Sequence, residues 1–429
     1  MFSFHSREVE PSVSDNSINV NSFFAGIGGF DLGFERQGFT NSFICENNDF
    51  CNEVLGCHWP NVPKFGDINE LPSDSIPEAP VWCGGFPCQD ISVARGSMSR
   101  LGLKGSRSGL FYRFAELIRD HKPKVVLIEN VAGLFNSNKG NDFGCVLSTL
   151  NDLGYGVAWR LLNSRYFGVP QSRPRVYLCC WRDNPVDALR VMFEQENPRK
   201  PGAARTAFIT ESTPSGKYPR VAKMGYCLAA TSGRHTGTDW SRTYVTCENG
   251  VRRLTPIECE RLQGFPDNWT RVDGDSEDAD SHRYAAIGNA VSVPVIEWIA
   301  NRISSVLSDE NTGDIEQAIC EYRPFSKNDW EDLPDMNEAH EKLIWGKSGL
   351  MWNGKFILAE HRECSCKSVD TNLYEIVEKA RVKDRYYLTP NAAEGILRRV
   401  DNNNRRLFEP LRDGLEKLAA QKEEGALNE

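Results

Sequence analysis

Residues 18–29 read INVNSFFAGIGG, a short apolar run that leads into a glycine-rich turn and then into a helical stretch. Such a turn brings bare backbone close to a ligand, because glycine adopts conformations that other residues avoid. Gly26 and Gly28 fit a dinucleotide fingerprint, but Asp31 occupies the place of its third glycine. We therefore expect a cofactor-binding strand, turn and helix that differ from a dinucleotide site.

The stretch from residue 18 to 181 alternates short apolar runs with helical segments, which predicts an α/β fold with a doubly wound parallel sheet. We expect strands at 18–24, 42–45, 81–84, 125–129, 156–162 and 175–181, and helices at 31–37, 111–120 and 143–153. Ligands of such sheets bind at the carboxyl ends of the strands. The glycine-rich turn and two reactive side chains, Cys88 and Glu129, are expected at that edge.

Cys88 lies on the turn GGFPCQ of residues 84–89, and Glu129 ends the apolar run at 125–129. A lone cysteine is more often a buried structural thiol than a nucleophile. Here the chain also contains Glu129 and the alternating Arg173 and Arg175 as candidate partners of the thiol. Such partners favour a nucleophilic cysteine over a structural one. A thiolate and a carboxyl group at strand ends suit attack on a ring that must also be protonated.

Six short blocks, in this order, resemble the cytosine carbon-5 DNA methyltransferases over roughly residues 18–308. They are FAGIGG at 24–29, PCQ at 87–89, ENV at 129–131, QSRPR at 171–175, RLQGFP at 261–266 and GNAV at 288–291. The resemblance implies a Rossmann-like methyltransferase domain, S-adenosylmethionine as cofactor and duplex DNA as partner. It also implies that the target cytosine is swung out of the helix, since the chemistry cannot occur inside a stacked duplex.

The resemblance assigns catalytic roles to four residues. Cys88 adds to carbon 6 of the cytosine, so that carbon 5 becomes nucleophilic enough to take a methyl group. A free cysteine has a pKa of about 8.5, so the thiol needs help to ionise. Glu129 holds or protonates ring nitrogen 3, Arg175 contacts the base and the glutamate, and Arg173 helps to hold the catalytic loop.

The resemblance also implies a set of cofactor contacts. Phe24 would lie against the adenine, Glu46 would accept the ribose hydroxyls, and Asp67 would lie near the adenine amino group. Asn47 stands where several relatives carry an aromatic residue that stacks on the adenine, which bears on affinity more than on cofactor identity. The full expected set is Phe24, Gly26, Ile27, Gly28, Glu46, Asp67, Ile68, Pro87, Leu110, Asn289 and Val291.

DNA readout is expected in residues 182–250, a short and irregular target-recognition lobe in which Cys227-Leu228 replaces the Thr-Leu of relatives. Residues 182–253 hold twelve basic and seven acidic side chains, which fits either a solvated basic face or a phosphate-contacting face. The segment 90–108, with glycines and four cations, is expected to close over DNA. The expected DNA contacts are Gln89, Ser92, Arg95, Arg234 and Arg242.

Domain boundaries follow from these patterns. We expect a disordered 1–17, a catalytic and cofactor-binding domain at 18–181, the recognition lobe at 182–250 and a return to the catalytic domain at 251–308. Residues 309–429 are expected to form a linker and an α-rich, phage-like extension of unknown role. It carries the basic cluster Arg398, Arg399, Arg405 and Arg406, for which DNA contact and a solvated helix face are equal alternatives. His361, Cys364 and Cys366 lack a fourth ligand at convincing spacing, so we expect no metal.

Bulk properties exclude a membrane protein. The 429 residues have a net charge of −9, no long apolar run and no signal-like N-terminus, so we expect a cytoplasmic monomer, bacterial or phage-encoded. A relative acting on transfer RNA and a DNA-binding pseudo-enzyme stay open as alternatives. The block GFPCQ favours a DNA enzyme over the first, and intact Cys88, Glu129 and Arg175 disfavour the second. Whether a restriction endonuclease accompanies the protein is not encoded in this chain.

Overall fold

A computed structural model describes residues 17–87, 109–195, 210–211, 219–233, 239–247, 250–272, 277–309, 313–322, 330–336, 342–364 and 371–426. Its centre is a ten-stranded sheet with the strand order β12-β14-β13-β6-β7-β5-β4-β1-β2-β3, in which β12 is Glu331–Asp332, β13 is Ser348–Trp352 and β14 is Lys355–Leu358. The first seven strands in the chain are β1 (Asn19–Phe23), β2 (Thr40–Cys45), β3 (Lys64–Phe65), β4 (Val81–Gly84), β5 (Val125–Val131), β6 (Tyr155–Asn163) and β7 (Pro174–Arg182). Every strand predicted from the sequence is present, with ends that differ by at most two residues.

The sheet is mixed, so the prediction of a parallel sheet is wrong for one half of it. Strands β3, β2, β1, β4 and β5 are parallel, whereas β7 runs antiparallel to both β5 and β6. Parallel neighbours need a crossover of a dozen or more residues, usually a helix. Only residues 164–173, which include one short turn of helix, separate β6 from β7, so the chain reverses there.

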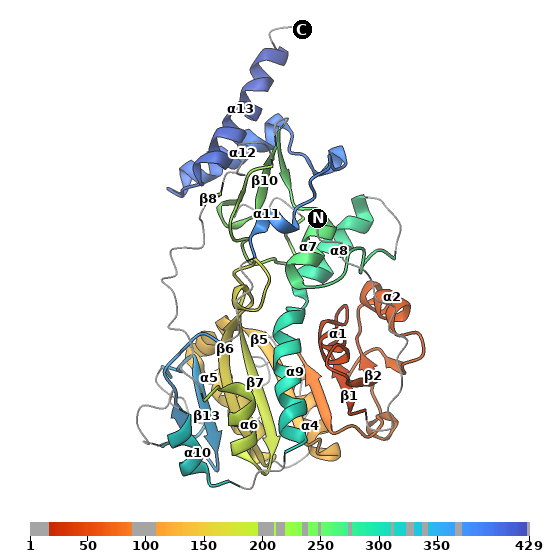
Figure 1. Ribbon diagram of the computed structural model, residues 1–429, viewed down its shortest axis with the longest axis vertical. Coiled ribbons are helices and arrows are strands. Elements are labelled where there is room, and N and C mark those ends of the chain that lie inside the picture. The colour runs from red at the N-terminus through yellow and green to blue at the C-terminus, as the bar shows by residue number, and fades with distance from the viewer. Residues whose placement is uncertain are drawn as a thin grey trace.

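Helices cover both faces of the sheet, as Figure 1 shows. Alternate residues of one strand point to opposite faces. Thus Val126 and Ile128 of β5 belong to the core under α4 and α5, and Val125 and Leu127 belong to the core under α1, α6 and α9. These helices are α1 (Gly29–Glu35), α4 (Leu110–His121), α5 (Asn141–Asp152), α6 (Pro185–Met192) and α9 (Val293–Leu307).

A second, smaller region lies beyond the carboxyl ends of the parallel strands (Figure 1). Its described strands form two small antiparallel pairs, β8 (Thr210–Glu211) with β9 (Val221–Ala222) and β10 (Tyr244–Cys247) with β11 (Gly250–Arg253). The helices α2 (Asp49–His58), α7 (Pro256–Gln263) and α8 (Glu277–Asn289) share a hydrophobic core with β9 and β10. A Thr255–Glu258 capping box and Pro256 at the first turn define where α7 begins.

The C-terminal residues do not form one separate module. Strands β12 (Glu331–Asp332), β13 (Ser348–Trp352) and β14 (Lys355–Leu358) extend the main sheet beyond β6, while α10 (Ile315–Glu321) lies between them and α9 in the chain. Of the remaining helices, α12 (Pro390–Asn402) and α13 (Glu409–Ala426) lie at the other end of the molecule, and α11 (Leu373–Ile376) lies nearer its middle, beside α7 (Figure 1). In the part of the chain that the structure describes, no helix combines the length and apolarity needed to cross a membrane.

Candidate active site

The glycine-rich turn after β1 has the left-handed backbone that its sequence predicts. Phe24, Gly26 and Gly28 have φ angles of 53°, 57° and 80°. The carboxylate of Glu46, which directly follows β2, accepts hydrogen bonds from the backbone N–H of Gly26 at 2.7 Å and of Asn48 at 2.8 Å. Glu46 therefore fixes the turn against the neighbouring strand end, and the residue is only 9% exposed.

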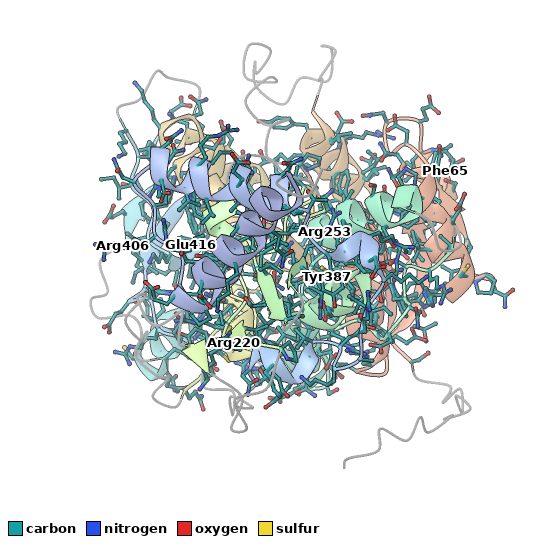
Figure 2. All side chains as sticks on the ribbon, turned by 90° about the horizontal axis from the view of Figure 1, so that it is seen from above. Phe65, Arg220, Arg253, Tyr387, Arg406 and Glu416 are labelled. Atoms are coloured by element: carbon teal, nitrogen blue, oxygen red, sulfur yellow. The ribbon has the colours of Figure 1, made fainter. Side chains whose placement is uncertain are left out.

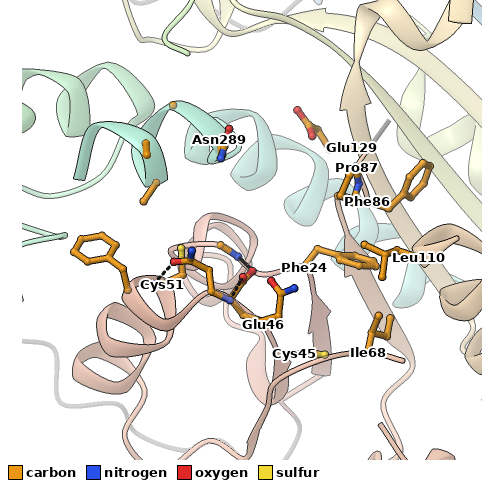
Figure 3. A pocket seen from close by; sticks show the side chains of 18 of the residues that line it. Phe24, Cys45, Glu46, Cys51, Ile68, Phe86, Pro87, Leu110, Glu129 and Asn289 are labelled. Atoms are coloured by element: carbon orange, nitrogen blue, oxygen red, sulfur yellow. Dashed lines mark hydrogen bonds between the residues drawn. The ribbon is translucent and has the colours of Figure 1, made fainter. Parts of the chain in front are cut away.

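A cavity of about 580 Å³ opens beside this turn, at the carboxyl ends of β1, β2, β4 and β5. Figure 3 shows Glu129 and Pro87 at one side of it and Glu46 at the other, with Phe24 and Leu110 along the wall below Glu129. Eight of the eleven predicted cofactor residues line the cavity: Phe24, Gly26, Glu46, Asp67, Ile68, Pro87, Leu110 and Asn289.

The other three predicted cofactor residues pack behind the wall. The side chain of Ile27 is fully buried in the core that contains α2 and α8. Gly28 approaches the ring of Trp59 so closely that a Cβ at Gly28 would lie 2.3 Å from it. Val291 packs on Gly29 in the same way, because a Cβ at Gly29 would lie 2.7 Å from the Val291 side chain. The structure thus places Ile27, Gly28 and Val291 in positions that shape the turn.

Glu129 and Arg175 form a buried ion pair in the same cavity. Arg175 Nε lies 3.0 Å from Glu129 Oε1, and the side chains of Arg175 and Glu129 are 14% and 11% exposed, respectively. The pair forms because β5 and β7 are antiparallel neighbours in which Glu129 faces Tyr177 and Val131 faces Arg175. Burial raises the pKa of Glu129 above its ordinary value, and the charges of Arg175 and Arg173 partly oppose that rise.

Asn130 is a functional candidate that the sequence reasoning missed. Its side-chain amide donates to the carbonyl of Phe86 at 2.9 Å, and its oxygen accepts the N–H of Val131. The bond to Phe86 ties the end of β5 to the turn that leads from β4 into Pro87 and Cys88. Asn130 stands inside the ENV block, so a search for side chains beside Glu129 could have found it.

Arg173 has a tethering position. Its guanidinium is buried and donates to the carbonyls of Leu228 (2.8 Å), Gly288 (3.1 Å) and Ala290 (2.7 Å). These bonds hold the start of β7, the segment around Leu228 and the end of α8 together. The contact with a catalytic loop that the resemblance implies for Arg173 involves residues outside those described.

Two buried glutamines reinforce this junction. Gln171 donates to the carbonyl of Leu262 at 2.9 Å and accepts the N–H of Leu228 at 2.9 Å. Gln263 donates to the carbonyls of Ile287 and Ala290. Buried amides that satisfy their bonds in this way fix the geometry of the elements they join. Gln171 lies in the QSRPR block and Gln263 in the RLQGFP block. The side chain of Gln171 donates to that of Gln263 at 3.1 Å, a contact that no pattern in the sequence predicts.

Phe50 and His282 were also missed. Both line the cavity near Asn47, and their ring centroids lie 5.6 Å apart. Phe50 stands in α2 three positions after Asn47, so it supplies an aromatic surface close to the place where the sequence has only the amide of Asn47. His282 comes from α8, more than two hundred residues along the chain, and no local signal pairs the two.

Most of the predicted DNA contacts fall on residues that the structure does not describe. Cys88, Gln89, Ser92, Arg95, Arg234 and the segment 90–108 lie outside the described residues, as does Cys366 of the weighed metal site. Arg242 is described, and it donates to the carbonyl and hydroxyl of Thr231 at 2.6 and 3.2 Å. In this structure Arg242 stabilises the loop around Thr231.

Fold and site together define an α/β enzyme with a cofactor-type cavity that also contains an ionisable pair. The model of the C-5 cytosine-specific DNA methylase family matches residues 18–211 and 194–305. The chain belongs to this family and is a DNA (cytosine-5-)-methyltransferase.

Individual relatives agree with this assignment. The type II methyltransferase M.NgoBI of Neisseria gonorrhoeae is 36% identical over 304 residues, which are 66% of this chain and 92% of the relative. M.HhaI of Haemophilus parahaemolyticus is 31% identical over 317 residues, which are 66% and 94% of the two chains. The solved Entamoeba histolytica methyltransferase EhMeth shares the fold, with a TM-score of 0.51 at 20% identity over 68% of this chain and all of that one.

Proposed function

We propose that this enzyme transfers a methyl group from S-adenosylmethionine to carbon 5 of a cytosine that has been swung out of duplex DNA. The observation that carries the proposal is the buried Glu129–Arg175 pair at 3.0 Å, which shares one cavity with the Phe24–Gly26 turn and Glu46. A cofactor bound at the turn and a base held at Glu129 would therefore meet in the same space.

The residues present fit S-adenosylmethionine. Phe24, Ile68 and Leu110 give an apolar wall for an adenine, and Glu46 and Asp67 add carboxylates at the ends of the neighbouring elements. A Cβ at Gly26 would meet no atom within 4 Å, so the turn leaves room for a ligand against its backbone. S-adenosylmethionine, when bound, supplies an electrophilic methyl group.

The chain's own residues prepare the cytosine. The Cys88 thiolate forms a bond to carbon 6, and Glu129 gives a proton to nitrogen 3, so that no full negative charge develops on the ring. Arg175 orients Glu129 through the observed ion pair. When carbon 5 gains the methyl group, nitrogen 3 returns its proton to Glu129, and the proton of carbon 5 then leaves to a base such as water. The electrons of that bond then re-form the 5,6 double bond and expel Cys88 as thiolate.

The named relatives are type II methyltransferases, and this supports a role in protecting DNA against a restriction endonuclease. Such a role requires a defined target sequence. We propose that residues 182–250 recognise that sequence in duplex DNA. The boundaries of this lobe stay a prediction.

The test is tritium transfer from labelled S-adenosylmethionine to unmethylated duplex DNA by wild type, Cys88→Ser and Arg119→Gln, the last a partly exposed control on α4. We expect 5-methylcytosine with wild type and the control, and no transfer with Cys88→Ser. Label in transfer RNA instead of DNA, or full activity of Cys88→Ser, would contradict the proposal.

A further inference from the structure

The C-terminal helices complete the core of the recognition lobe. Tyr244 and Val251, from the β10–β11 hairpin, are buried in one hydrophobic cluster with residues of α12 and α13, among them Ile396, Val400 and Leu415. The packing is close, because a Cβ added to Gly414 of α13 would lie 2.7 Å from Thr246 of β10. A two-stranded hairpin is marginal by itself, and these helices cover one of its faces.

The backbone of the C-terminal segment also pairs with β11, the strand that forms a hairpin with β10 and directly follows the lobe boundary expected at residue 250. Tyr387 forms a bridge with Arg252 of β11, and the N–H of Leu388 donates to the carbonyl of Val251 at 2.8 Å. Arg253 donates to the carbonyls of Gly233 and Arg385, one from the lobe and one from the C-terminal segment. Helix α12 begins directly after this bridge, with Thr389 as its N-cap. Residues 371–426 are therefore a second chain segment of the same lobe.

This segment carries a concentrated positive charge. Residues 398–406 contain four arginines and a single acid, Asp401. Asp401 is engaged by Arg412 of α13 at 3.0 Å, and Arg398, Arg405 and Arg406 are exposed. The net charge of the chain is −9, so this is a local surplus of positive charge. Such a surplus would attract the phosphate groups of a partner.

Trp240 joins the charged segment to the lobe. The guanidinium of Arg405 lies 5.5 Å from the centre of the Trp240 ring, and Trp240 comes from the part of the lobe between residues 239 and 241. The stack keeps Arg405 at the boundary between the two chain segments. In the view from above in Figure 2, Arg406 lies at the edge of the molecule, and Arg253 and Tyr387 lie nearer its middle.

We propose that Arg398, Arg405 and Arg406 bind backbone phosphates of the DNA flanking the methylated site, and that residues 371–426 are the second half of the recognition lobe. The proposal rests on the proposed function, which brings duplex DNA to this lobe. Arginine suits the task because its planar fork of donors matches phosphate oxygens. Duplex DNA is the favoured partner because the surface continues from a lobe of a DNA methyltransferase.

The experiment compares the wild type with a triple variant, Arg398→Gln, Arg405→Gln and Arg406→Gln, by fluorescence anisotropy. A short duplex that covers only the target and a long duplex with flanks are titrated over a range of salt concentrations. The control is Arg119→Gln, Arg182→Gln and Lys355→Gln, the same charge change on partly exposed side chains of the catalytic domain. Arg182 stands at the other end of β7 from Arg175.

We expect the triple variant to bind the long duplex at least about tenfold more weakly, and to bind the short duplex like wild type. The slope of log K against log salt should become less steep by about 0.9 for each phosphate that the variant no longer neutralises. Methyl transfer at saturating DNA and the melting temperature should match the control. Unchanged affinity and slope on the long duplex would overturn the inference. A wild type that binds DNA but transfers no methyl group would instead contradict the proposed function, so the two failures are distinguishable.

Discussion

Glu129 shows how one residue can be tuned by opposing neighbours. Its burial at the end of β5 raises the pKa of the carboxyl group, while Arg175 at 3.0 Å favours the charged form. A carboxyl group with a raised pKa keeps its proton to a higher pH than an ordinary carboxyl group does, which favours protonation of a ring nitrogen. The sequence predicts this residue from a strand end, but the ion pair needs the antiparallel register of β5 and β7.

Glu129→Gln should lower methyl transfer by about 100-fold or more, because a positioned general acid contributes about that much. Activity that needs the protonated carboxyl falls as pH rises through the raised pKa, so the wild-type rate has a descending alkaline limb that the variant lacks. Initial rates over a pH series check both points. S-adenosylmethionine affinity, measured by calorimetry, is the control and should stay unchanged. A variant with the wild-type rate would rule out Glu129 as the acid.

Asp31 should make the stability of the folded protein depend on pH. It is fully buried, bonds Ser22 at 3.1 Å through one oxygen, and its other oxygen has no hydrogen-bond partner among the described residues. Burial raises its pKa to about 7. Unfolded aspartate has a pKa of about 3.9, so the folded protein retains a proton that the unfolded chain releases. Stability from this group is present below about pH 4 and is lost as pH rises toward 7.

Asp31→Asn should therefore raise the free energy of unfolding at pH 8 by up to about 4 kcal/mol, and change it much less at pH 4. Thermal unfolding of wild type and variant at both pH values is the measurement. An equal effect at both pH values would show that the carboxyl group does not titrate in this way.

In the glycine-rich turn, the left-handed backbone predicted from the sequence is present in the structure. Its two glycines have different roles, one beside the cavity and one packed against a side chain. Gly26 and Gly28 both have positive φ, and both are predicted from the sequence as cofactor contacts. Only Gly26 lines the cavity, whereas Gly28 lies against Trp59. Sequence spacing could not separate the two, because Trp59 arrives from the far end of α2.

Gly26→Ala should weaken S-adenosylmethionine binding, because the added Cβ would occupy the open space beside the turn, where no protein atom lies within 4 Å of it. It should also cost about 1 kcal/mol of stability, because an alanine at this positive φ is strained. Gly28→Ala should lower the melting temperature much further, because its Cβ would lie 2.3 Å from Trp59. Calorimetry and thermal unfolding of the two variants provide matched measurements. Equal losses of stability would contradict the division.

At the scale of the whole molecule, local patterns predicted the strands, the helices around them and the cavity edge, but not the course of the C-terminal residues. β13 and β14 join the ten-stranded sheet, and α12 and α13 pack on the β10–β11 hairpin. These pairings connect residues more than one hundred positions apart, such as Met351 with Val157 and Leu388 with Val251. Periodicity within a segment predicts its own structure and carries no information about such distant partners.

The C-terminal helices and the cofactor cavity belong to different cores, so damage to one should spare the other. Leu415 of α13 is fully buried in the cluster that holds Tyr244 and Val251, whereas Phe24 and Leu110 pack on the core under α4. Leu415→Ala should cost about 2–5 kcal/mol. We expect it to weaken DNA binding while S-adenosylmethionine affinity stays at the wild-type value. Lys417→Ala, on the same helix with a side chain 70% exposed, is the control and should change neither. Parallel loss of both affinities in Leu415→Ala would show that the recognition lobe and the cofactor site unfold as one unit.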